Sequence, residues 1–391
     1  MFNGFKNLGK SKITSTLLTT VFCLLTLGLL MVYDSTMFYS QSIYESSYRF
    51  AILQLVWVVL GLIGFFIFFN LHYKRLLKVS VIFFGFSIAF LAILSLFGFL
   101  TFQLKLIECS SVFPLVPCIN GAYRWFYLNF SPLSDIPLFG VLSFQPAELV
   151  KFSVVLYMSA LLSKTKDFSK FILPVGLVFF LILLQPNMST ACLIVLISLC
   201  IYFVSEAPLK PLFFLCPFLI LLLSLVVIVS PYRRQRFFTL INSSENKEES
   251  LSTGYHENQI LISLGSGGLF GVGIGQSRQK YHYLPEVASD SIFAIFGEET
   301  GFLGTLLFVL AFSFLVYQGY RIALNAPDTF SRLLAVGFTS WLGLQFFINI
   351  AAMSQIIPLT GIPIPLVSYG GSSMIFTLCG LGVLANISKY C

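Results

Sequence analysis

The sequence is poor in charged residues, and this scarcity excludes a water-soluble fold. Asp, Glu, Lys and Arg make up only 10% of the 391 residues, whereas soluble domains carry about 25%. Hydrophobic residues make up 57%. A water-facing surface cannot be built from so few charges, so much of the chain must face lipid.

Motifs for metals, redox chemistry and nucleotides are also missing. The eight cysteines form no CxxC pair, and the three histidines show no metal-ligand spacing. Six glycines fall between Gly265 and Gly275, but no Lys-Ser/Thr pair follows at Walker spacing and no strand precedes them. We therefore expect no protein metal cage and no tightly bound cofactor, and we interpret the glycines as permitting close backbone approach in a re-entrant or interfacial segment.

Long apolar runs are abundant, and they have the length that a bilayer of roughly 30 Å requires of a helix. The runs are continuous rather than alternating, which argues against a β-barrel. We predict an all-α polytopic membrane protein of about ten helices, with residues 1–391 forming one transmembrane domain. The helices are expected at roughly 15–33, 49–70, 77–101, 147–163, 171–184, 188–205, 209–230, 290–320, 332–356 and 370–388.

The distribution of Lys and Arg predicts the orientation. With the N-terminus in the cytoplasm, 13 of the 23 basic residues fall in short inner segments. An even number of spans returns the C-terminus to the cytoplasm and leaves two long outer segments, at about 102–146 and 231–289. Most remaining basic residues lie on these outer segments, and an anionic ligand outside would explain them.

Cys109 and Cys118 both fall on the first outer segment, while the other cysteines lie in apolar runs or near the inner C-terminus. Disulfides form and persist outside the cytoplasm. We predict a Cys109–Cys118 disulfide; the alternative is two free thiols near the interface.

The segment 264–299 carries the carboxylates of greatest interest. Asp290 lies where the chain enters the eighth helix, shortly after Glu286, and suits either a helix cap or a general base at the membrane boundary. Glu298 and Glu299 lie one to two turns deeper, where ionisable groups are costly. These two glutamates either line a cavity or pair with a basic residue.

Four further segments carry groups that suit a binding site or a cavity. Glu148 and Lys151 share a helix face and form either an ion pair or, with Lys151 turned to a cavity, a phosphate site. Arg124, beside a tryptophan, and Arg236, in an arginine cluster, suit a diphosphate or lipid headgroups. The prolines at 358–365 break any helix, and the run from Ser368 to Ser372 follows them. This last segment predicts a cavity rim or a structural plug.

Together these segments resemble the SEDS family (shape, elongation, division and sporulation), typified by FtsW and RodA. The matching motifs occur in family order: GAYRW at 121–125, QPAELVK at 145–151, QPNMSTA at 185–191, YRRQR at 232–236, GSGGLFGVGIGQSRQKYHYLPEVASDSIFAIFGEE at 265–299, and PLTGIPIPLVSYGGSSM at 358–374. With the helix count they cover nearly the whole chain. The SRQK and YLPE motifs are more similar to those of the division-type FtsW branch than to those of the elongation-type RodA branch.

The resemblance implies a peptidoglycan glycosyltransferase that polymerises lipid II with inversion, releasing a lipid diphosphate and forming β-1,4 linkages. The family's catalytic aspartate corresponds to Asp290. Arg124, Lys151, Arg236 and Lys280 are the candidates for binding the diphosphate, alone or with a divalent cation (Mg²⁺ or Mn²⁺). Glu148, Glu286, Glu298, Glu299, Ser368 and Ser372 are candidates for lining or supporting the cavity.

The resemblance also predicts partners and location. No transpeptidase domain is present, so a single-span class B penicillin-binding protein is expected to crosslink the product. Other division or cell-wall proteins and membrane lipids are further expected partners, and nucleic acid is not. The protein is expected in the bacterial inner membrane, with its active site on the periplasmic side at the division septum.

Three sequence departures and two rival functions remain open. The family usually has His-Thr before the catalytic aspartate, where this chain has Ala288-Ser289, and Asn187 replaces an aspartate in the QPD motif. The segment before Gln145 is several residues longer than usual. A lipid II flippase, or a non-catalytic scaffold that activates a transpeptidase, would suit many of the same features.

Overall fold

The computed structural model describes most of the chain as packed helices. The described residues are 2–102, 115–119, 121–127, 143–213, 215, 217, 224, 228, 254–281 and 284–391. Within them, helices occupy nine of the ten expected positions: α1 Phe2–Tyr44, α2 Arg49–Asn70, α3 Lys74–Phe102, α4 Pro146–Leu162, α5 Phe168–Leu184, α6 Met188–Val204, α10 Ile292–Leu324, α11 Thr329–Met353 and α12 Gly371–Ser388. The expected seventh helix, at 209–230, lies mostly outside the described residues.

These helices confirm the prediction of an all-α, multi-pass membrane protein. Six of them, α1, α2, α3, α10, α11 and α12, are long and apolar enough to cross a membrane. The helices α5 and α6 are shorter but also apolar. Exposed leucines, isoleucines and phenylalanines cover the outward faces of the long helices, which is the surface that hydrocarbon requires.

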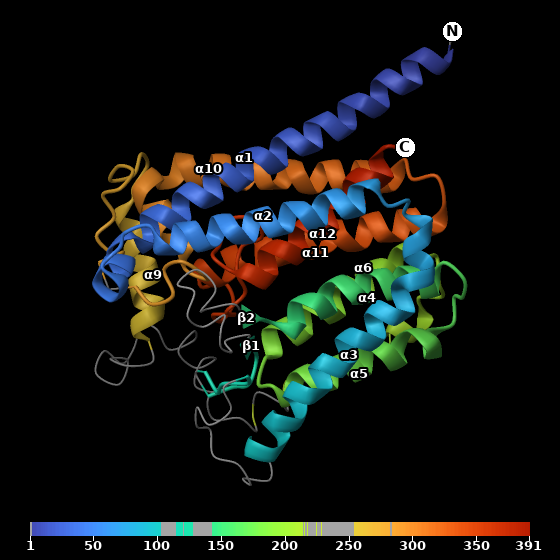
Figure 1. Ribbon diagram of the computed structural model, residues 1–391, viewed down its shortest axis with the longest axis horizontal. Helices are drawn as coiled ribbons and strands as arrows, with labels where there is room; N and C mark the ends of the chain where they lie inside the picture. Colours follow the sequence, from blue (N-terminus) through green and yellow to red (C-terminus); the bar gives the residue numbers. More distant parts are fainter. Residues whose placement is uncertain are drawn as a thin grey trace.

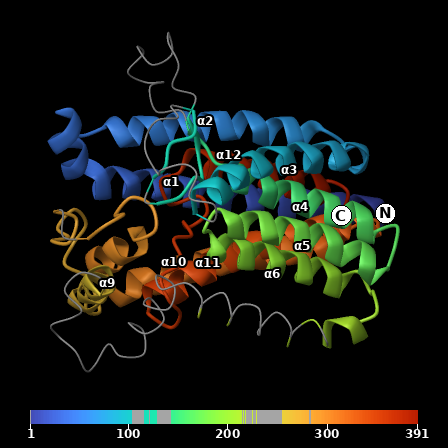
Figure 2. The same ribbon diagram turned by 90° about the horizontal axis from the view of Figure 1, so that it is seen from below.

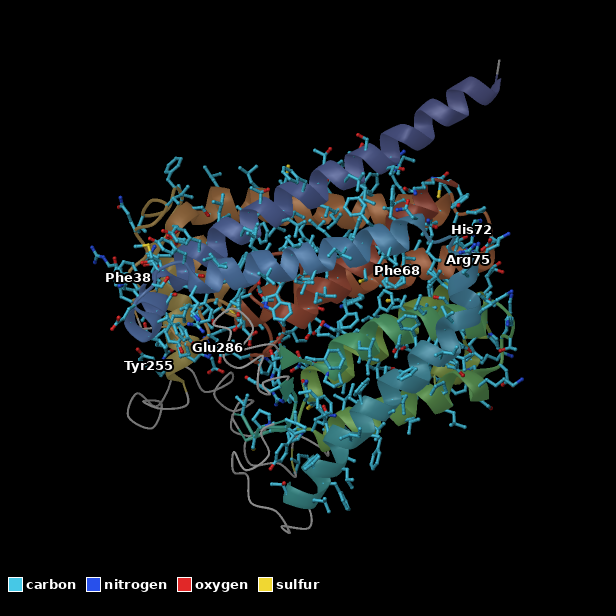
Figure 3. The ribbon with its side chains drawn as sticks, in the orientation of Figure 1. Phe38, Phe68, His72, Arg75, Tyr255 and Glu286 are labelled. Carbon is cyan, nitrogen blue, oxygen red and sulfur yellow. The ribbon has the colours of Figure 1, made fainter. Side chains whose placement is uncertain are left out.

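The helices run side by side, and both chain termini lie at the same end of the bundle (Figures 1 and 2). At that end His72 and Arg75 mark the short α2–α3 connection (Figure 3). Phe38, Tyr255 and Glu286 mark the opposite end. The labelled residues of the predicted inner and outer segments therefore lie at opposite ends, while the side of the membrane that each end faces stays a prediction.

The helices α11 and α12 form the centre of the bundle. In each of them 78% of the apolar window is buried, compared with 22–39% in the other four long helices. The contact between α12 and α2 is close because glycines line it. A Cβ on Gly382 would lie 2.5 Å from the Phe65 carbonyl oxygen, so a larger side chain would force these two helices apart.

Three features differ from the sequence prediction. Helix α1 continues to Tyr44 rather than ending near Val32, because residues 33–44 contain no proline or glycine to stop it. A short helix, α9 (Tyr255–Ser266), forms within the second outer segment and packs on α10. Two short strands within the first outer segment, β1 (Phe126–Tyr127) and β2 (Ser143–Phe144), pair antiparallel just before α4 begins.

Candidate active site

A compact turn carries Asp290 to the start of α10. Glu286 has a positive φ of 52°, and its carbonyl oxygen accepts hydrogen bonds from the N–H groups of Ser289 and Ser291, at 3.1 and 3.2 Å. The Ser289 hydroxyl donates to the Glu286 carboxylate at 2.8 Å. Glu286 therefore supports the turn. The N-cap of α10 is Ser291, and Asp290 lies one residue before it.

Helix α11 holds the backbone of this turn from inside the bundle. The side-chain amide of Asn349 donates to the carbonyl oxygens of Asp290, at 3.0 Å, and of Ile362, at 2.8 Å. Asn349 is fully buried. One side chain thus ties the Asp290 turn to the proline-rich segment that follows α11.

The proline-rich segment passes directly beside the Asp290 carboxylate. Gly361 has a positive φ of 67°, and a Cβ there would lie 3.3 Å from Asp290 Oδ2. Further along, the Tyr369 N–H donates to the Ala288 carbonyl oxygen at 2.8 Å. The structure therefore brings together two of the segments that the sequence identified separately, and Asp290 is partly exposed between them.

Ser368 and Ser372 fix the far end of the proline-rich segment. The Ser368 hydroxyl accepts a hydrogen bond from the Ile364 N–H at 2.9 Å, and Gln54 of α2 donates to the Ser368 carbonyl oxygen at 3.2 Å. Ser372 accepts from the Gln145 N–H at 3.0 Å. Both serines are buried and support the loop between α11 and α12.

Glu148 and Lys151 form the expected ion pair. Lys151 Nζ lies 2.8 Å from Glu148 Oε1, and the Lys151 side chain is 2% exposed. Lys151 also donates to Gln345 Oε1 at 2.8 Å, and Gln345 in turn donates to the Pro363 carbonyl oxygen at 2.8 Å. This chain of contacts connects the pair to the same proline-rich segment that flanks Asp290.

Sequence reasoning missed Gln345 and Asn349. They lie four residues apart on one face of α11 and hold the carbonyl oxygens of Pro363 and Ile362. The sequence did contain a signal for them: two side-chain amides within the apolar stretch of α11. A buried amide needs hydrogen-bond partners, so these two residues could have been predicted to bind another segment of the chain.

Arg124 lies beside the connection between α5 and α6. Its guanidinium donates to the Pro186 carbonyl oxygen at 2.6 Å. The neighbouring Asn187 caps α6, since its side chain accepts from the Thr190 N–H at 3.4 Å. The amide that replaces the family's aspartate thus has a structural role here. Arg236 lies outside the described residues.

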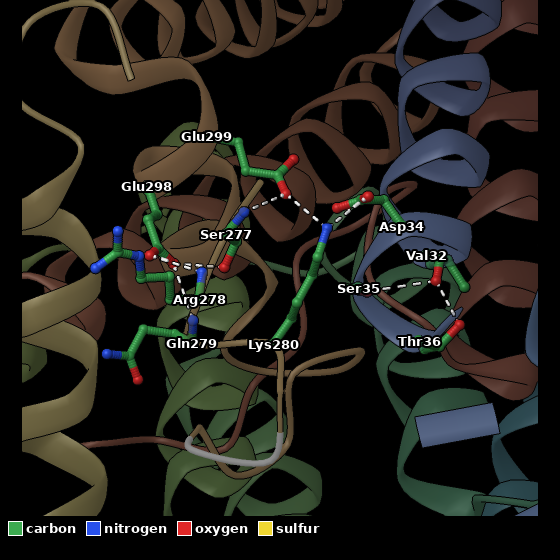
Figure 4. A network of polar contacts seen from close by, with 10 residues as sticks. All are labelled: Val32, Asp34, Ser35, Thr36, Ser277, Arg278, Gln279, Lys280, Glu298 and Glu299. Atoms are coloured by element: carbon green, nitrogen blue, oxygen red, sulfur yellow. Dashed lines mark hydrogen bonds and ion pairs between the residues drawn. The ribbon is translucent and has the colours of Figure 1, made fainter. Parts of the chain in front are cut away.

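Lys280 lies in a buried network of ion pairs (Figure 4). Its ammonium group is 2.8 Å from Asp34 of α1 and 3.0 Å from Glu299 of α10, and its side chain is 2% exposed. Burial alone would lower the pKa of Lys280, but its hydrogen bonds to Asp34 and Glu299 raise the pKa above its ordinary value. These contacts argue against the expected role of Lys280 as a diphosphate ligand.

Glu298 is saturated by donors from the segment before α10 (Figure 4). It accepts from the N–H groups of Arg278, at 3.0 Å, and Gln279, at 3.4 Å, and from the hydroxyls of Ser263 and Ser277. Glu298 and Glu299 are each 2% exposed. Of the two alternatives for these glutamates, the structure shows pairing with a basic residue for Glu299, through Lys280. Glu298 is instead held by backbone N–H groups and serine hydroxyls.

The glycine-rich segment completes a break in α10. At Gly301 the backbone leaves the helical region (φ 66°, ψ −167°). Before the break, the carbonyl oxygens of Glu298 and Glu299 accept hydrogen bonds from the N–H groups of Val272 and Gly273 in the glycine-rich segment. After the break, the N–H groups of Phe302 and Leu303 donate to the carbonyl oxygens of Gly268 and Leu269. All four bonds measure 2.9–3.1 Å. Close backbone approach, as predicted, is what the glycines permit here.

Cys118 forms a disulfide, and five other cysteines in the described part of the chain are free. The predicted partner, Cys109, lies outside the described residues. The Cys109–Cys118 pairing therefore stays a prediction.

Comparison with known proteins identifies the family. The FtsW/RodA/SpoVE family model, described as "Cell cycle protein", matches residues 15–391. The chain belongs to this family. FtsW/RodA/SpoVE relatives with high coverage include the stage V sporulation protein E of Bacillus subtilis, 35% identical over 94% of both chains. The probable peptidoglycan glycosyltransferase FtsW of Coxiella burnetii is 34% identical over 93% of both chains.

Solved structures of FtsW/RodA/SpoVE members share the fold. One chain, from a peptidoglycan synthase complex described as coordinating polymerization and crosslinking, is 26% identical with a TM-score of 0.73, covering 96% of this chain and 97% of that one. The rod shape determining protein RodA of Thermus thermophilus is 25% identical with a TM-score of 0.61, covering 96% of each chain. The sequence resemblance to this family is thereby confirmed.

Proposed function

We propose that this chain is a peptidoglycan glycosyltransferase that polymerises lipid II into β-1,4-linked glycan strands. Relatives that span nearly its full length carry the name of that activity. The observation that carries the proposal is the placement of Asp290. Asp290 is partly exposed, its carboxylate lies beside Gly361, and its backbone is held by Asn349.

In the proposed reaction Asp290 removes the proton from the 4-hydroxyl of the acceptor N-acetylglucosamine. That oxygen attacks C1 of the donor strand's N-acetylmuramic acid, and the C1–O bond to the lipid diphosphate breaks. The diphosphate leaves with the bonding electron pair, and the α configuration becomes β. General-base assistance contributes about 10²–10⁴-fold, and positioning two membrane-anchored substrates contributes further.

Arg124 and Arg236 remain the proposed ligands of the diphosphate. Lys151 is 2% exposed and paired with Glu148, so, like Lys280, it is proposed to support the site rather than to bind the diphosphate. Across the described part of the chain, no cluster of three or more His, Cys, Asp or Glu side chains suits a metal. A Mg²⁺ or Mn²⁺ ion would therefore be ligated mainly by the diphosphate oxygens.

The contacts of Glu298 and Glu299 weaken the case for a flippase. A transporter needs polar groups that line a path for its substrate, whereas these two glutamates are buried and bonded to Lys280 and to the segment before α10. A non-catalytic scaffold would need no base at Asp290, so the assay below distinguishes it.

The proposed partner is a single-span class B penicillin-binding protein, and the proposed site of action is the periplasmic side of the inner membrane at the division septum. The similarity to a chain from a complex that coordinates polymerization and crosslinking supports such a partner. The relatives named FtsW support a role in division.

Purified protein with lipid II in detergent tests the proposal, alone and with the co-purified transpeptidase. Glycan chains formed there, with no membrane to cross, would exclude flipping as the sole activity. Asp290→Asn keeps the side-chain size but removes the base, so we expect at least about a 100-fold loss of polymerisation with an unchanged melting temperature. Asp167→Asn, at the exposed N-cap of α5, is the matched control. A folded Asp290→Asn variant that polymerises normally would disprove the assignment.

A further inference from the structure

Helix α9 lies beside the start of α10 (Figures 1 and 2) and contacts it through one face. His256, Ile260 and Ser263 are spaced four and three residues apart, which places them on the same side of the helix. Ile260 is fully buried, and the Ser263 hydroxyl donates to the Ala294 carbonyl oxygen at 2.9 Å. At the other end of this face, His256 Nε2 lies 2.9 Å from the Ser291 hydroxyl.

The Ser291 hydroxyl has an unusual partner for its position. A serine at a helix N-cap usually accepts a hydrogen bond from an N–H of the first turn. Ser291 is the N-cap of α10, yet its side chain makes no such bond. The hydroxyl is fully buried and is bonded to His256 instead. The imidazole therefore satisfies a buried polar group that would be costly to leave unpaired.

This contact lies one peptide bond from the proposed base. The Asp290 carbonyl is held by Asn349 of α11, and the following residue, Ser291, is held by His256 of α9. The peptide group between Asp290 and Ser291 is thus held from two different helices. Without either contact, the turn would be freer to rotate, and the Asp290 carboxylate beside Gly361 would move with it.

We propose that His256 is a positioning residue for Asp290. Its hydrogen bond to Ser291 fixes the turn so that the carboxylate faces the acceptor hydroxyl. This inference rests on the proposed function, because it assigns His256 to the same reaction. His256 does not touch the reacting atoms, so its loss lowers turnover without weakening substrate binding.

Either tautomer of His256 makes the bond, because the Ser291 hydroxyl can donate or accept. A glutamine side chain places an amide near the position of Nε2 and can also donate or accept. His256→Gln should therefore keep the hydrogen bond to Ser291 that His256→Ala removes. Ser291→Ala deletes the same bond from the other side with the loss of a single oxygen atom.

The test measures kcat and KM for lipid II polymerisation, together with the melting temperature, for five variants of the full chain. These are His256→Ala, His256→Gln, Ser291→Ala, the His256→Ala/Ser291→Ala double variant, and Asn258→Ala on the exposed face of α9 as a control. We expect His256→Ala and Ser291→Ala each to lower kcat by about 10–100-fold with KM unchanged. The double variant should be no worse than either single variant. His256→Gln should stay within about threefold of the wild type, and Asn258→Ala should not differ from it.

The outcomes separate this inference from the proposed function. If Asp290→Asn is inactive but folded His256→Ala and Ser291→Ala variants polymerise at the wild-type rate, the positioning role is refuted and the proposed function stands. A proportional rise in KM, or additive losses in the double variant, would also refute positioning. If His256→Ala does not fold, Ser291→Ala and His256→Gln decide the matter. A fully active Asp290→Asn variant would instead refute the proposed function.

Discussion

Replacing Lys280 with methionine should destabilise the protein strongly. The methionine keeps most of the side-chain length, so packing changes little, but Asp34 and Glu299 then face each other without the ammonium group that lies 2.8 and 3.0 Å from them. Removing one partner of a buried ion pair typically costs about 3–5 kcal/mol. At roughly 2–4 °C per kcal/mol, this predicts a melting temperature lower by about 6–20 °C.

The matched control is the same substitution at an exposed pair. Lys166 lies 3.5 Å from Glu206, and its side chain is 55% exposed. Exposed pairs contribute about 0–1 kcal/mol, so Lys166→Met should leave the melting temperature almost unchanged. Thermal unfolding of both variants in one detergent, followed by the fluorescence of a thiol-reactive dye or by light scattering, makes the comparison.

Removing the two carboxylates as well should recover part of the lost stability. The Asp34→Asn/Lys280→Met/Glu299→Gln variant has no uncompensated charge in this network, so we expect it to melt above Lys280→Met. If Lys280→Met melts within about 2 °C of the wild type, the network does not stabilise the fold. A raised KM for lipid II with normal melting would restore Lys280 as a substrate ligand.

The remaining predictions concern other parts of the fold. Gly301→Ala should cost at least about 1–3 kcal/mol, because a φ of 66° combined with a ψ of −167° suits only glycine and a Cβ there would lie 2.3 Å from the Gly271 nitrogen. Gly265→Ala, where a Cβ meets no atom within 4 Å, should be tolerated in the same denaturation assay. Burial alone would raise the pKa of Asp328, but hydrogen bonds from Tyr73 and Ser331 lower it below its ordinary value. The ionised carboxylate therefore stabilises the folded state above the pKa of the unfolded state, and Asp328→Asn should cost about 1 kcal/mol at pH 7. This difference should shrink from about pH 4 downward, as the pH falls through the lower pKa of the folded state, and a constant difference in melting temperature down to about pH 3 would contradict it. A cysteine at the exposed Asn258 position, in a background without native thiols, should react with an impermeant maleimide in intact spheroplasts, and labelling only after lysis would invert the predicted topology.

The spans were predictable because hydropathy is a local property. Lipid contact requires long apolar runs, and the described helices follow those runs closely. The limits of α1 were not predictable in this way: its last turns, around Asp34, are more polar than its centre, and contacts with Lys280 far along the chain help to hold them.

The candidate site was predictable in its parts but not in their assembly. The motif around Asp290 and the proline-rich segment could each be recognised, but their contact depends on Asn349 of a third segment. Lys280 looked like a ligand for an anion because the sequence shows its charge and not its neighbours. Burial against Asp34 and Glu299 reverses that interpretation, and only tertiary structure supplies it.

The break at Gly301 also has a consequence for how the protein opens. The hydrogen bonds that cross the break come from the glycine-rich segment and not from the helix itself. In amide hydrogen exchange, Phe302 and Leu303 should therefore be protected only while that segment stays in place. Val272 and Gly273 should exchange at matching rates, because all four amides become exposed in the same opening event. Two stretches that are distant in sequence would then behave as one cooperative unit, and α10, although covalently continuous, would consist of two units of local stability.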